Sequence, residues 1–212
     1  MIKRILAASA AALFLGLLSA AAQAVPIVSG SVWLVGAGEA GNAIPANVPA
    51  TPADVTFQAP SDPLSFDSRG SPVNDYNLLN FLLTGGAFNI VEHTAGALLN
   101  TTNNHLYQFL GQVTVTNGMN FGVLHDDGLT LIIGGLTVIN APGPTSPILT
   151  NATYTGPTGT FDFELVYGEC CGPPAALIID LPLVTQVPEP ASVLLLAIGL
   201  IGLGLTQRRR TR

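Results

Sequence analysis

Two adjacent carboxylates are the residues of this chain best placed to do chemistry. Asp126 and Asp127 lie in the run NFGVLHDDGLTLII, between two apolar segments, and Gly128 follows them. Ca²⁺ takes about six to eight oxygen ligands, and neighbouring carboxylates on a loop supply charge at one point. The pair is therefore a candidate Ca²⁺ site. The alternative is a plain turn, because Asp tolerates turn geometry and Gly supplies a positive φ.

The two cysteines of the chain are also adjacent. Cys170 and Cys171 lie in the run GECCGPP, which is rich in turn residues. In an oxidising compartment they can form a vicinal disulfide, remain free thiols or link two chains. We favour the vicinal disulfide, which would rigidify the turn beside Glu169. A zinc site is disfavoured, because two cysteines without a histidine cluster provide too few ligands.

The sequence contains no recognisable catalytic centre. The histidines, His93, His105 and His125, are scattered, and no nucleophile elbow or metalloprotease motif accompanies them. Asp162 and Glu164 resemble the carboxylate pair of a glycoside hydrolase, but they alternate onto the outer face of one strand. Nothing apolar beside them would raise one pKa. We therefore predict no catalytic residues and a protein that is not an enzyme.

The segments that carry these residues are predicted to be antiparallel β-strands. Short runs of Val, Ile, Thr and Phe alternate with Gly and Pro. In TFDFELVY, the apolar Phe161, Phe163, Leu165 and Tyr167 face one way, and Asp162 and Glu164 face the other. Gly134 and Gly135 between two apolar runs indicate a tight hairpin. The predicted strands are Ser31–Val35, Leu106–Val115, Phe121–Leu124, Leu129–Ile133, Leu136–Ile139, Thr160–Tyr167 and Ala176–Leu181.

Little helix is predicted. One short helix or covering turn is expected over Asp75–Leu83, and Ala43–Asp62, rich in Pro, Ala and Thr, is expected to be an irregular connection. Short strands without alternating helices argue for a mostly β fold. We predict an antiparallel β-sandwich or barrel of jelly-roll-like type over residues 25–184.

The order of these motifs resembles the protective-antigen-type (PA-fourteen) β-domain of bacterial toxins, glycosidases and fungal adhesins. That family runs from a strand through Asp-Asp-Gly to a hairpin of apolar strands, then to a Tyr-x-Glu turn and a final strand. The resemblance covers Gly30–Leu183 and is clearest over 106–181. It departs from the family at Ile133–Leu136 and in lacking the usual tryptophan and arginine. The matching residues are Asp126, Asp127, Gly128, Gly134, Gly135, Tyr167, Glu169 and Gly172.

This resemblance implies a role for the two aspartates. In the lectin members of the family, the aspartates are joined by a cis peptide and hold a Ca²⁺ ion that binds sugar hydroxyls. By resemblance, Asp126 and Asp127 would be Ca²⁺ ligands. The lectins complete the site with an asparagine or with carbonyls from a later loop, for which Asn140, Asn151 and Glu169 are the candidates here.

The N-terminal segment reads as an export signal. Lys3 and Arg4 precede an uninterrupted apolar run, and Ala22-Gln23-Ala24 has the small-x-small pattern that signal peptidase reads. We predict a signal peptide over residues 1–24, cleaved after Ala24. The alternative is an uncleaved N-terminal anchor.

The C-terminal segment is apolar over Ala191–Thr206, and an arginine cluster follows it. At ~1.5 Å per residue, such a helix reaches about 24 Å and can span a locally thinned bilayer. We predict a transmembrane helix over 191–206 rather than a buried helix of a soluble domain. The arginines that hold its end in the cytoplasm, by the positive-inside rule, are Arg208, Arg209, Arg210 and Arg212.

Pro188, Glu189 and Pro190 stand immediately before this helix. The order of tripeptide, apolar helix and arginine cluster over 187–212 resembles the PEP-CTERM sorting signal of Gram-negative bacteria. The resemblance implies cleavage near the tripeptide by an exosortase, a transpeptidase-like membrane protease. Before cleavage the chain would be anchored in the membrane transiently. The cleaved chain would go to the cell surface or the extracellular matrix.

The charge of the exported body limits its partners. Arg69 is the single basic residue between the two end segments, whereas all thirteen acidic residues lie between Glu39 and Glu189. Without a basic surface, nucleic acid is excluded as a partner, and anionic lipid headgroups are disfavoured. Divalent cations and neutral glycans stay plausible. Solubility alone would also explain the charge.

These observations favour one function over two alternatives. We expect an exported, exosortase-sorted surface or matrix protein whose β-domain contacts exopolysaccharide, with Ca²⁺ as its one candidate cofactor. The first alternative is a structural component of the biofilm matrix without a specific ligand. The second, less favoured, is a secreted glycoside hydrolase.

Overall fold

The computed structural model describes residues 27–60, 63–72, 76–180 and 182, and these belong to one compact unit that spans Pro26–Thr185. The predicted signal peptide, Pro-Glu-Pro motif, transmembrane helix and cytoplasmic arginines all lie outside the described residues. Within the described part of the chain, no helix has the length and apolar character needed to cross a bilayer.

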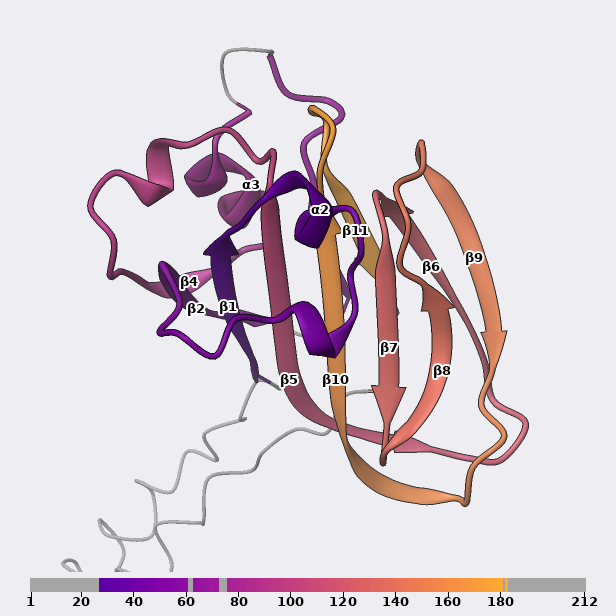
Figure 1. Cartoon of the computed structure of the whole chain (residues 1–212). Coiled ribbons are helices and arrows are strands. Elements are labelled where there is room, and N and C mark those ends of the chain that lie inside the picture. Colours follow the sequence, from indigo (N-terminus) through magenta and orange to yellow (C-terminus); the bar gives the residue numbers. More distant parts are fainter. Residues whose placement is uncertain (1–26, 61–62, 73–75, 181, 183–212) are drawn as a thin grey trace, which may run out of the picture. The chain divides into compact units, whose positions relative to one another are not determined.

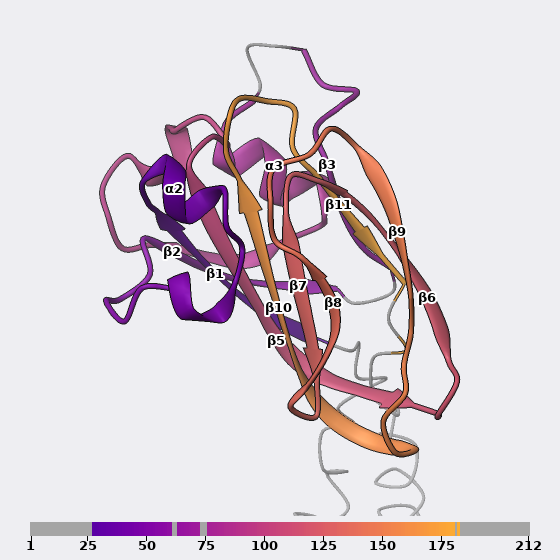
Figure 2. The same ribbon diagram turned by 45° about the vertical axis from the view of Figure 1, so that its right-hand side comes forward.

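Two antiparallel sheets make up the domain (Figure 1). The larger has seven strands, in the order β4 (Phe88–Glu92), β2 (Val55–Pro60), β1 (Ile27–Leu34), β5 (His105–Val115), β10 (Gly159–Glu169), β7 (Leu129–Ile133) and β8 (Leu136–Ala141). The smaller has four, in the order β3 (Leu64–Asp67), β11 (Ala176–Ile179), β6 (Asn120–Asp126) and β9 (Ile148–Thr153). Figure 2 shows the smaller sheet lying alongside β10, β7 and β8.

The core lies between the two sheets. The ring of Phe66 in β3 lies 5.9 Å from that of Phe57 in β2 and 5.5 Å from that of Phe109 in β5. Helix α3 (Leu78–Thr84) covers the end of this core, where Phe81 lies 5.6 Å from Phe66. The Asn77 side chain caps the helix by accepting a hydrogen bond from the Asn80 N–H. Of the two predicted forms, the structure is the sandwich, because the described strands form two separate sheets.

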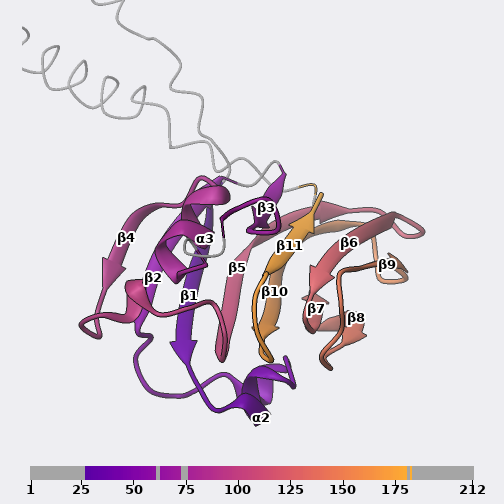
Figure 3. The ribbon, with the colours of Figure 1, turned by 90° about the horizontal axis from the view of Figure 1, so that it is seen from above.

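The outer face of the larger sheet is covered at one end. The segment between β1 and β2 contains α2 (Ala37–Ala40) and the 3-10 turn η1 (Pro45–Asn47). From it, Ala43 packs against Leu106 of β5 and Val166 of β10. Seen from above in Figure 3, α2 lies on the opposite side of the larger sheet from β11. This cover brings the α2 turn to the end of β10, where the candidate residues lie.

All seven predicted strands have counterparts in the structure. Gly134 and Gly135 join β7 to β8 with positive φ values of 57° and 81°, which confirms the hairpin. The predicted helix is α3, although it begins at Leu78 rather than Asp75. The prediction of an irregular segment over Ala43–Asp62 is wrong at its end, because Val55–Pro60 forms β2 with alternate residues buried. Sequence reasoning missed four strands, β2, β3, β4 and β9, and a 3-10 turn, η3 (Ala97–Leu99).

Candidate functional site

The two aspartates lie at the end of β6 and are sheltered from solvent. Asp126 is 8% exposed and Asp127 is 6% exposed, and the peptide bond between them is cis. A plain surface turn would leave both carboxylates in water. Here they lie instead among the turn after β10, the loop between β8 and β9, and the α2 turn.

Asp127 is oriented by two backbone donors from different loops. Its Oδ1 accepts a hydrogen bond of 3.0 Å from the Thr145 N–H, and its Oδ2 accepts one of 2.9 Å from the Cys170 N–H. Hydrogen bonds from N–H groups to a carboxylate are stronger than those between neutral partners. These two bonds fix the orientation of the Asp127 carboxylate, and each oxygen keeps a lone pair for a further contact.

Gly128 is required for space. A Cβ at this position would lie 2.0 Å from the carbonyl oxygen of Pro142. Gly168 is also required for space, because a Cβ there would lie 2.1 Å from the carbonyl oxygen of Ala40. The two glycines are joined by a hydrogen bond of 2.9 Å from the Gly168 N–H to the Gly128 carbonyl. The sequence-based reason for Gly128, a positive φ, is wrong, because Gly128 is not among the residues with positive φ. Close packing of backbones selects glycine here.

The carboxyl group of Asp126 has a raised pKa. Burial and the neighbouring charge of Asp127 raise the pKa of its carboxyl to about 6, and the charge of Arg69 opposes both effects. Arg69 is itself paired with Asp67, with Nη2 and Oδ2 2.7 Å apart. Asp67 and Asp126 flank Ala176 of β11 from either side, so this ion pair lies two strands away from the aspartates. The Arg69 guanidinium is therefore shared between a direct partner, Asp67, and a more distant one, Asp126.

Glu169 brings a third carboxyl group beneath the pair. It is fully buried, and its Oε2 lies 2.8 Å from the Tyr167 hydroxyl, which also contacts the Asp126 carbonyl oxygen. Its Oε1 has no hydrogen-bond partner among the described residues. Burial raises the pKa of Glu169 to about 10, with the charges of Asp127 and Asp126 acting in the same direction. Glu169 is therefore a neutral acid at neutral pH.

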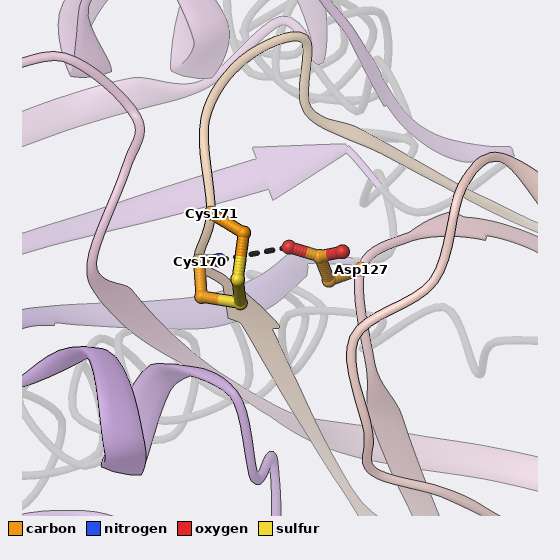
Figure 4. A group of neighbouring side chains, drawn as sticks. All are labelled: Asp127, Cys170 and Cys171. Atoms are coloured by element: carbon orange, nitrogen blue, oxygen red, sulfur yellow. Dashed lines mark hydrogen bonds between the residues drawn. A yellow bond between two sulfur atoms is a disulfide. The ribbon is translucent and has the colours of Figure 1, made fainter.

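The two cysteines form a disulfide beside Asp127. Cys170 is buried and Cys171 is exposed, and the Sγ–Sγ bond joins these neighbouring residues (Figure 4). The two sulfur atoms and a carboxylate oxygen of Asp127 all lie within 4.8 Å of one another. Because each sulfur is bonded to the other, neither is a thiolate in this state, and the donors left for a metal ion are oxygens.

His125 is satisfied by its neighbours. Its Nδ1 contacts the carbonyl oxygen of Asp127, and its Nε2 lies 2.7 Å from Thr150 Oγ1. A carbonyl oxygen only accepts, so Nδ1 carries the proton and Nε2 of the neutral ring accepts from Thr150. His125 also lines a shallow cavity of about 230 Å³, together with the loop Ala141–Thr145 and Ile148. This cavity adjoins the candidate site through Thr145.

The remaining sequence candidates lie elsewhere. Asn140 is exposed on β8 opposite Thr130, and Asn151 is exposed on β9 opposite Gly122. Of the three candidates for a further ligand, Glu169 is the one that Tyr167 links to Asp126. The Asp162 and Glu164 side chains accept hydrogen bonds on the outer face of the larger sheet, from Gln112 at 2.9 Å and from Gln108 at 2.7 Å.

Sequence reasoning missed the contribution of Thr145. Its part in the site is a backbone N–H, which any residue except proline can donate. Residue type therefore carries no signal for it. The same is true of the carbonyl groups of Pro142 and Ala40 that exclude a side chain at Gly128 and Gly168.

Comparisons with known proteins gave matches for the C-terminal segment and for the β-domain. A family model described as the PEP-CTERM protein-sorting motif matches residues 186–210. The solved PA14 sugar-binding domain from an RTX adhesin is 20% identical, with a TM-score of 0.51 over 74% of this chain and 88% of that one. The PA14 domain of the MpAFP antifreeze protein is 18% identical, with a TM-score of 0.49 over 76% and 83%. A search of curated proteins found no match.

Two statements follow from these findings. The predicted PEP-CTERM signal is confirmed, and such a motif marks a chain for export, transient membrane anchoring and sorting to the cell surface. The described β-domain has the fold of PA14 domains, as the predicted resemblance required.

Proposed function

We propose that this chain, which carries a PEP-CTERM sorting motif and a β-domain of the PA14 fold, is a non-enzymatic surface or matrix protein that binds extracellular polysaccharide through Ca²⁺. Asp126 and Asp127 are the proposed Ca²⁺ ligands. Signal peptidase and an exosortase would process the two ends. The adhesin whose PA14 domain is described as sugar-binding supports the choice of ligand class.

One observation carries the proposal: two neighbouring carboxylates are held together, largely out of water, at the end of β6. Within the described part of the chain, the Asp126 carboxylate accepts no hydrogen bond, and its raised pKa reflects the cost of burying charge beside Asp127. A divalent cation would offset that cost for both side chains. The donor set fits a hard cation, because the disulfide leaves oxygens as the available ligands.

The chain would prepare the site before any ligand arrives. The N–H groups of Thr145 and Cys170 fix the Asp127 carboxylate, so binding requires little reordering of this side chain. When bound, Ca²⁺ would supply open coordination positions for sugar hydroxyls. The adjoining cavity of about 230 Å³ would hold part of a sugar ring against the Pro142–Thr145 loop.

The charge of the domain favours a neutral polysaccharide. Arg69 is the single basic residue between positions 5 and 207, and it is already paired with Asp67. An anionic glycan would meet an acidic surface with no free cation to neutralise it. Neutral hydroxyl-rich chains do not carry this penalty.

Unfolding of the purified full chain in detergent, with EDTA or with millimolar Ca²⁺, tests the proposal. A ligand at a hundred times its Kd stabilises the native state by about 2.7 kcal/mol, or roughly 5–10 °C in Tm for a domain of this size. We expect this rise in the wild type and its loss in the double variant Asp126→Asn/Asp127→Asn. Retention on neutral glycan columns in Ca²⁺, with release by EDTA, then tests the ligand.

The alternative is a structural matrix protein without a ligand. It predicts the same export and the same fold, but no change of Tm with Ca²⁺ and no retention on any glycan column. A Tm that is identical in EDTA and Ca²⁺ would remove the Ca²⁺ site and leave this alternative.

A further inference from the structure

The disulfide lies beside Asp127, and the calcium proposal leaves its two sulfur atoms without a role. Figure 4 shows the Asp127 carboxylate directed at Cys170, with the sulfur atoms of both cysteines next to it. One carboxylate oxygen and the two sulfurs lie within 4.8 Å of one another, although Asp127 and Cys170 are 43 residues apart. Two cysteines alone supply too few ligands for a metal of the zinc type. The tertiary structure adds the third.

We propose that reduction of the Cys170–Cys171 disulfide opens a second kind of metal site, for a thiophilic divalent cation such as Zn²⁺. Its ligands are the two thiolates and the Asp127 carboxylate, with water in the fourth position. The oxidised chain offers this position oxygen donors alone, and the reduced chain offers two sulfurs and an oxygen. The redox state of the cysteines thus decides which class of cation can bind beside Asp127.

The spacing of the donors fits such an ion. Tetrahedral Zn²⁺ binds thiolate at about 2.3 Å and carboxylate at about 2.0–2.2 Å, which places neighbouring ligand atoms roughly 3.5–3.8 Å apart. The three donor atoms already lie within 4.8 Å of one another. After the S–S bond is broken, rotation about the two Cα–Cβ bonds is sufficient to admit the ion.

Asp127 is ready to act as the third ligand. Its two backbone donors, Thr145 and Cys170, occupy one lone pair on each oxygen and leave a second on each. These bonds orient the carboxylate in the way that second-shell partners orient metal ligands. Cys171 is exposed, which gives a reductant, the ion and the fourth ligand a route to the site.

An external dithiol can reduce the Cys170–Cys171 disulfide by thiol–disulfide exchange. A thiolate of the dithiol attacks one protein sulfur and releases the other as a thiolate, and the resulting mixed disulfide is resolved by the second thiol of the reagent. Two electrons and two protons pass to the protein, which becomes a dithiol, and the reagent becomes a cyclic disulfide. Binding of the divalent cation then displaces both thiol protons to solvent.

Cd²⁺ is the probe, because its bonds to thiolate give an ultraviolet charge-transfer band. The full chain is reduced with dithiothreitol, freed of reagent without oxygen and titrated with Cd²⁺. We expect the band to saturate at about one Cd²⁺ per reduced chain and to be absent from the oxidised chain. No band in the reduced chain, or the same band in the oxidised chain, would overturn the proposal.

Variants assign the third ligand. Cys170→Ser/Cys171→Ser should abolish the band, and Asp127→Asn should weaken Cd²⁺ binding on the order of tenfold, whereas its neighbour Asp126→Asn should not. Equal affinities for Asp127→Asn and Asp126→Asn would refute a role for Asp127. X-ray absorption of the Zn²⁺-loaded wild type needs no variant, and it should show two sulfur ligands and the remainder oxygen. Four sulfur ligands would indicate a bridge between chains and would also refute the site.

This site does not depend on the proposed function. Calcium binding is measured on the oxidised chain, and Cd²⁺ binding on the reduced chain. Failure of one therefore leaves the other standing.

Discussion

The backbone N–H of Cys170 donates a hydrogen bond of 2.9 Å to Oδ2 of Asp127, across 43 residues of sequence. This bond and the one from Gly168 to the Gly128 carbonyl attach the end of β10 to the turn after β6. As a result, the two adjacent aspartates, Asp126 and Asp127, have different hydrogen-bonding environments. Asp127 is held by the backbone, whereas Asp126 lies beside it without a comparable donor among the described residues.

This difference predicts opposite effects of the same substitution in EDTA. In Asp127→Asn, an amide N–H₂ replaces an oxygen that faces a backbone N–H, so we expect a loss of about 1–3 kcal/mol in the free energy of unfolding. Asp126→Asn removes a like charge that raises the cost of burial, so we expect an unchanged or higher value at neutral pH. Urea unfolding measures both. Equal destabilisation by the two variants would contradict the conclusion that backbone donors hold Asp127 and not Asp126.

Glu169 predicts a dependence of stability on pH. Its pKa rises from 4.5 to about 10 on folding, so between these values the native state holds a proton that the unfolded state has released. The contribution to stability is therefore complete below about pH 4.5 and declines as the pH rises towards 10. Glu169→Gln keeps the neutral form and should flatten the decline in unfolding free energy from about pH 5 to pH 9 in EDTA. A slope that is identical in wild type and variant would refute this role.

The packing around Gly128 predicts a severe effect of a single methyl group. In Gly128→Ala the Cβ would lie 2.0 Å from the Pro142 carbonyl oxygen, so the two loops must separate. We expect a loss of roughly 1–3 kcal/mol or more, together with a loss of any Ca²⁺-dependent rise in Tm. Gly143→Ala is the matched control in the facing loop, because nothing lies within 4 Å of its Cβ. Similar Tm values for both variants would show that the loops are not closely packed.

The sorting motif predicts where the chain accumulates. Replacing Pro188, Glu189 and Pro190 with alanine should leave a precursor of full C-terminal length in the membrane fraction, because the exosortase would no longer cleave it. Pro182→Ala, outside the matched motif, should be processed as the wild type is. Cell fractionation and intact mass measure both chains. Normal release of the triple variant would show that the motif does not direct processing.

The outer face of β10 tests the hydrolase alternative. Asp162, which is exposed, and Glu164, which is half-buried, accept hydrogen bonds from glutamine side chains on β5, and we expect these bonds to contribute little to stability. Asp162→Asn/Glu164→Gln should leave both the Tm and glycan retention within error of the wild type. Cleavage of a polysaccharide by the wild type and its loss in this variant would instead support a glycoside hydrolase.

Sequence reasoning found β10 from the alternation of its residues, and it missed β2 although alternate residues of β2 are also buried. In β10, Phe163 and Leu165 are buried and alternate with Asp162 and Glu164, so the period of two was legible. The edge strands β4 and β9 are mostly exposed on both faces and carry no such alternation. β3 has four residues, which is too short for a periodic pattern. These strands depend on pairing with neighbours that are distant in sequence.

The sequence by itself determined the address of this protein and the chemical types at its candidate site. A sorting signal is a contiguous segment that other proteins read, so its residue order is sufficient, and Asp126, Asp127, Glu169 and the cysteines were all visible as residue types. Only the tertiary structure decided their environment. The donors to Asp127 come from 18 and 43 residues away, and burial, which raises the pKa of Glu169, arises when the two sheets pack.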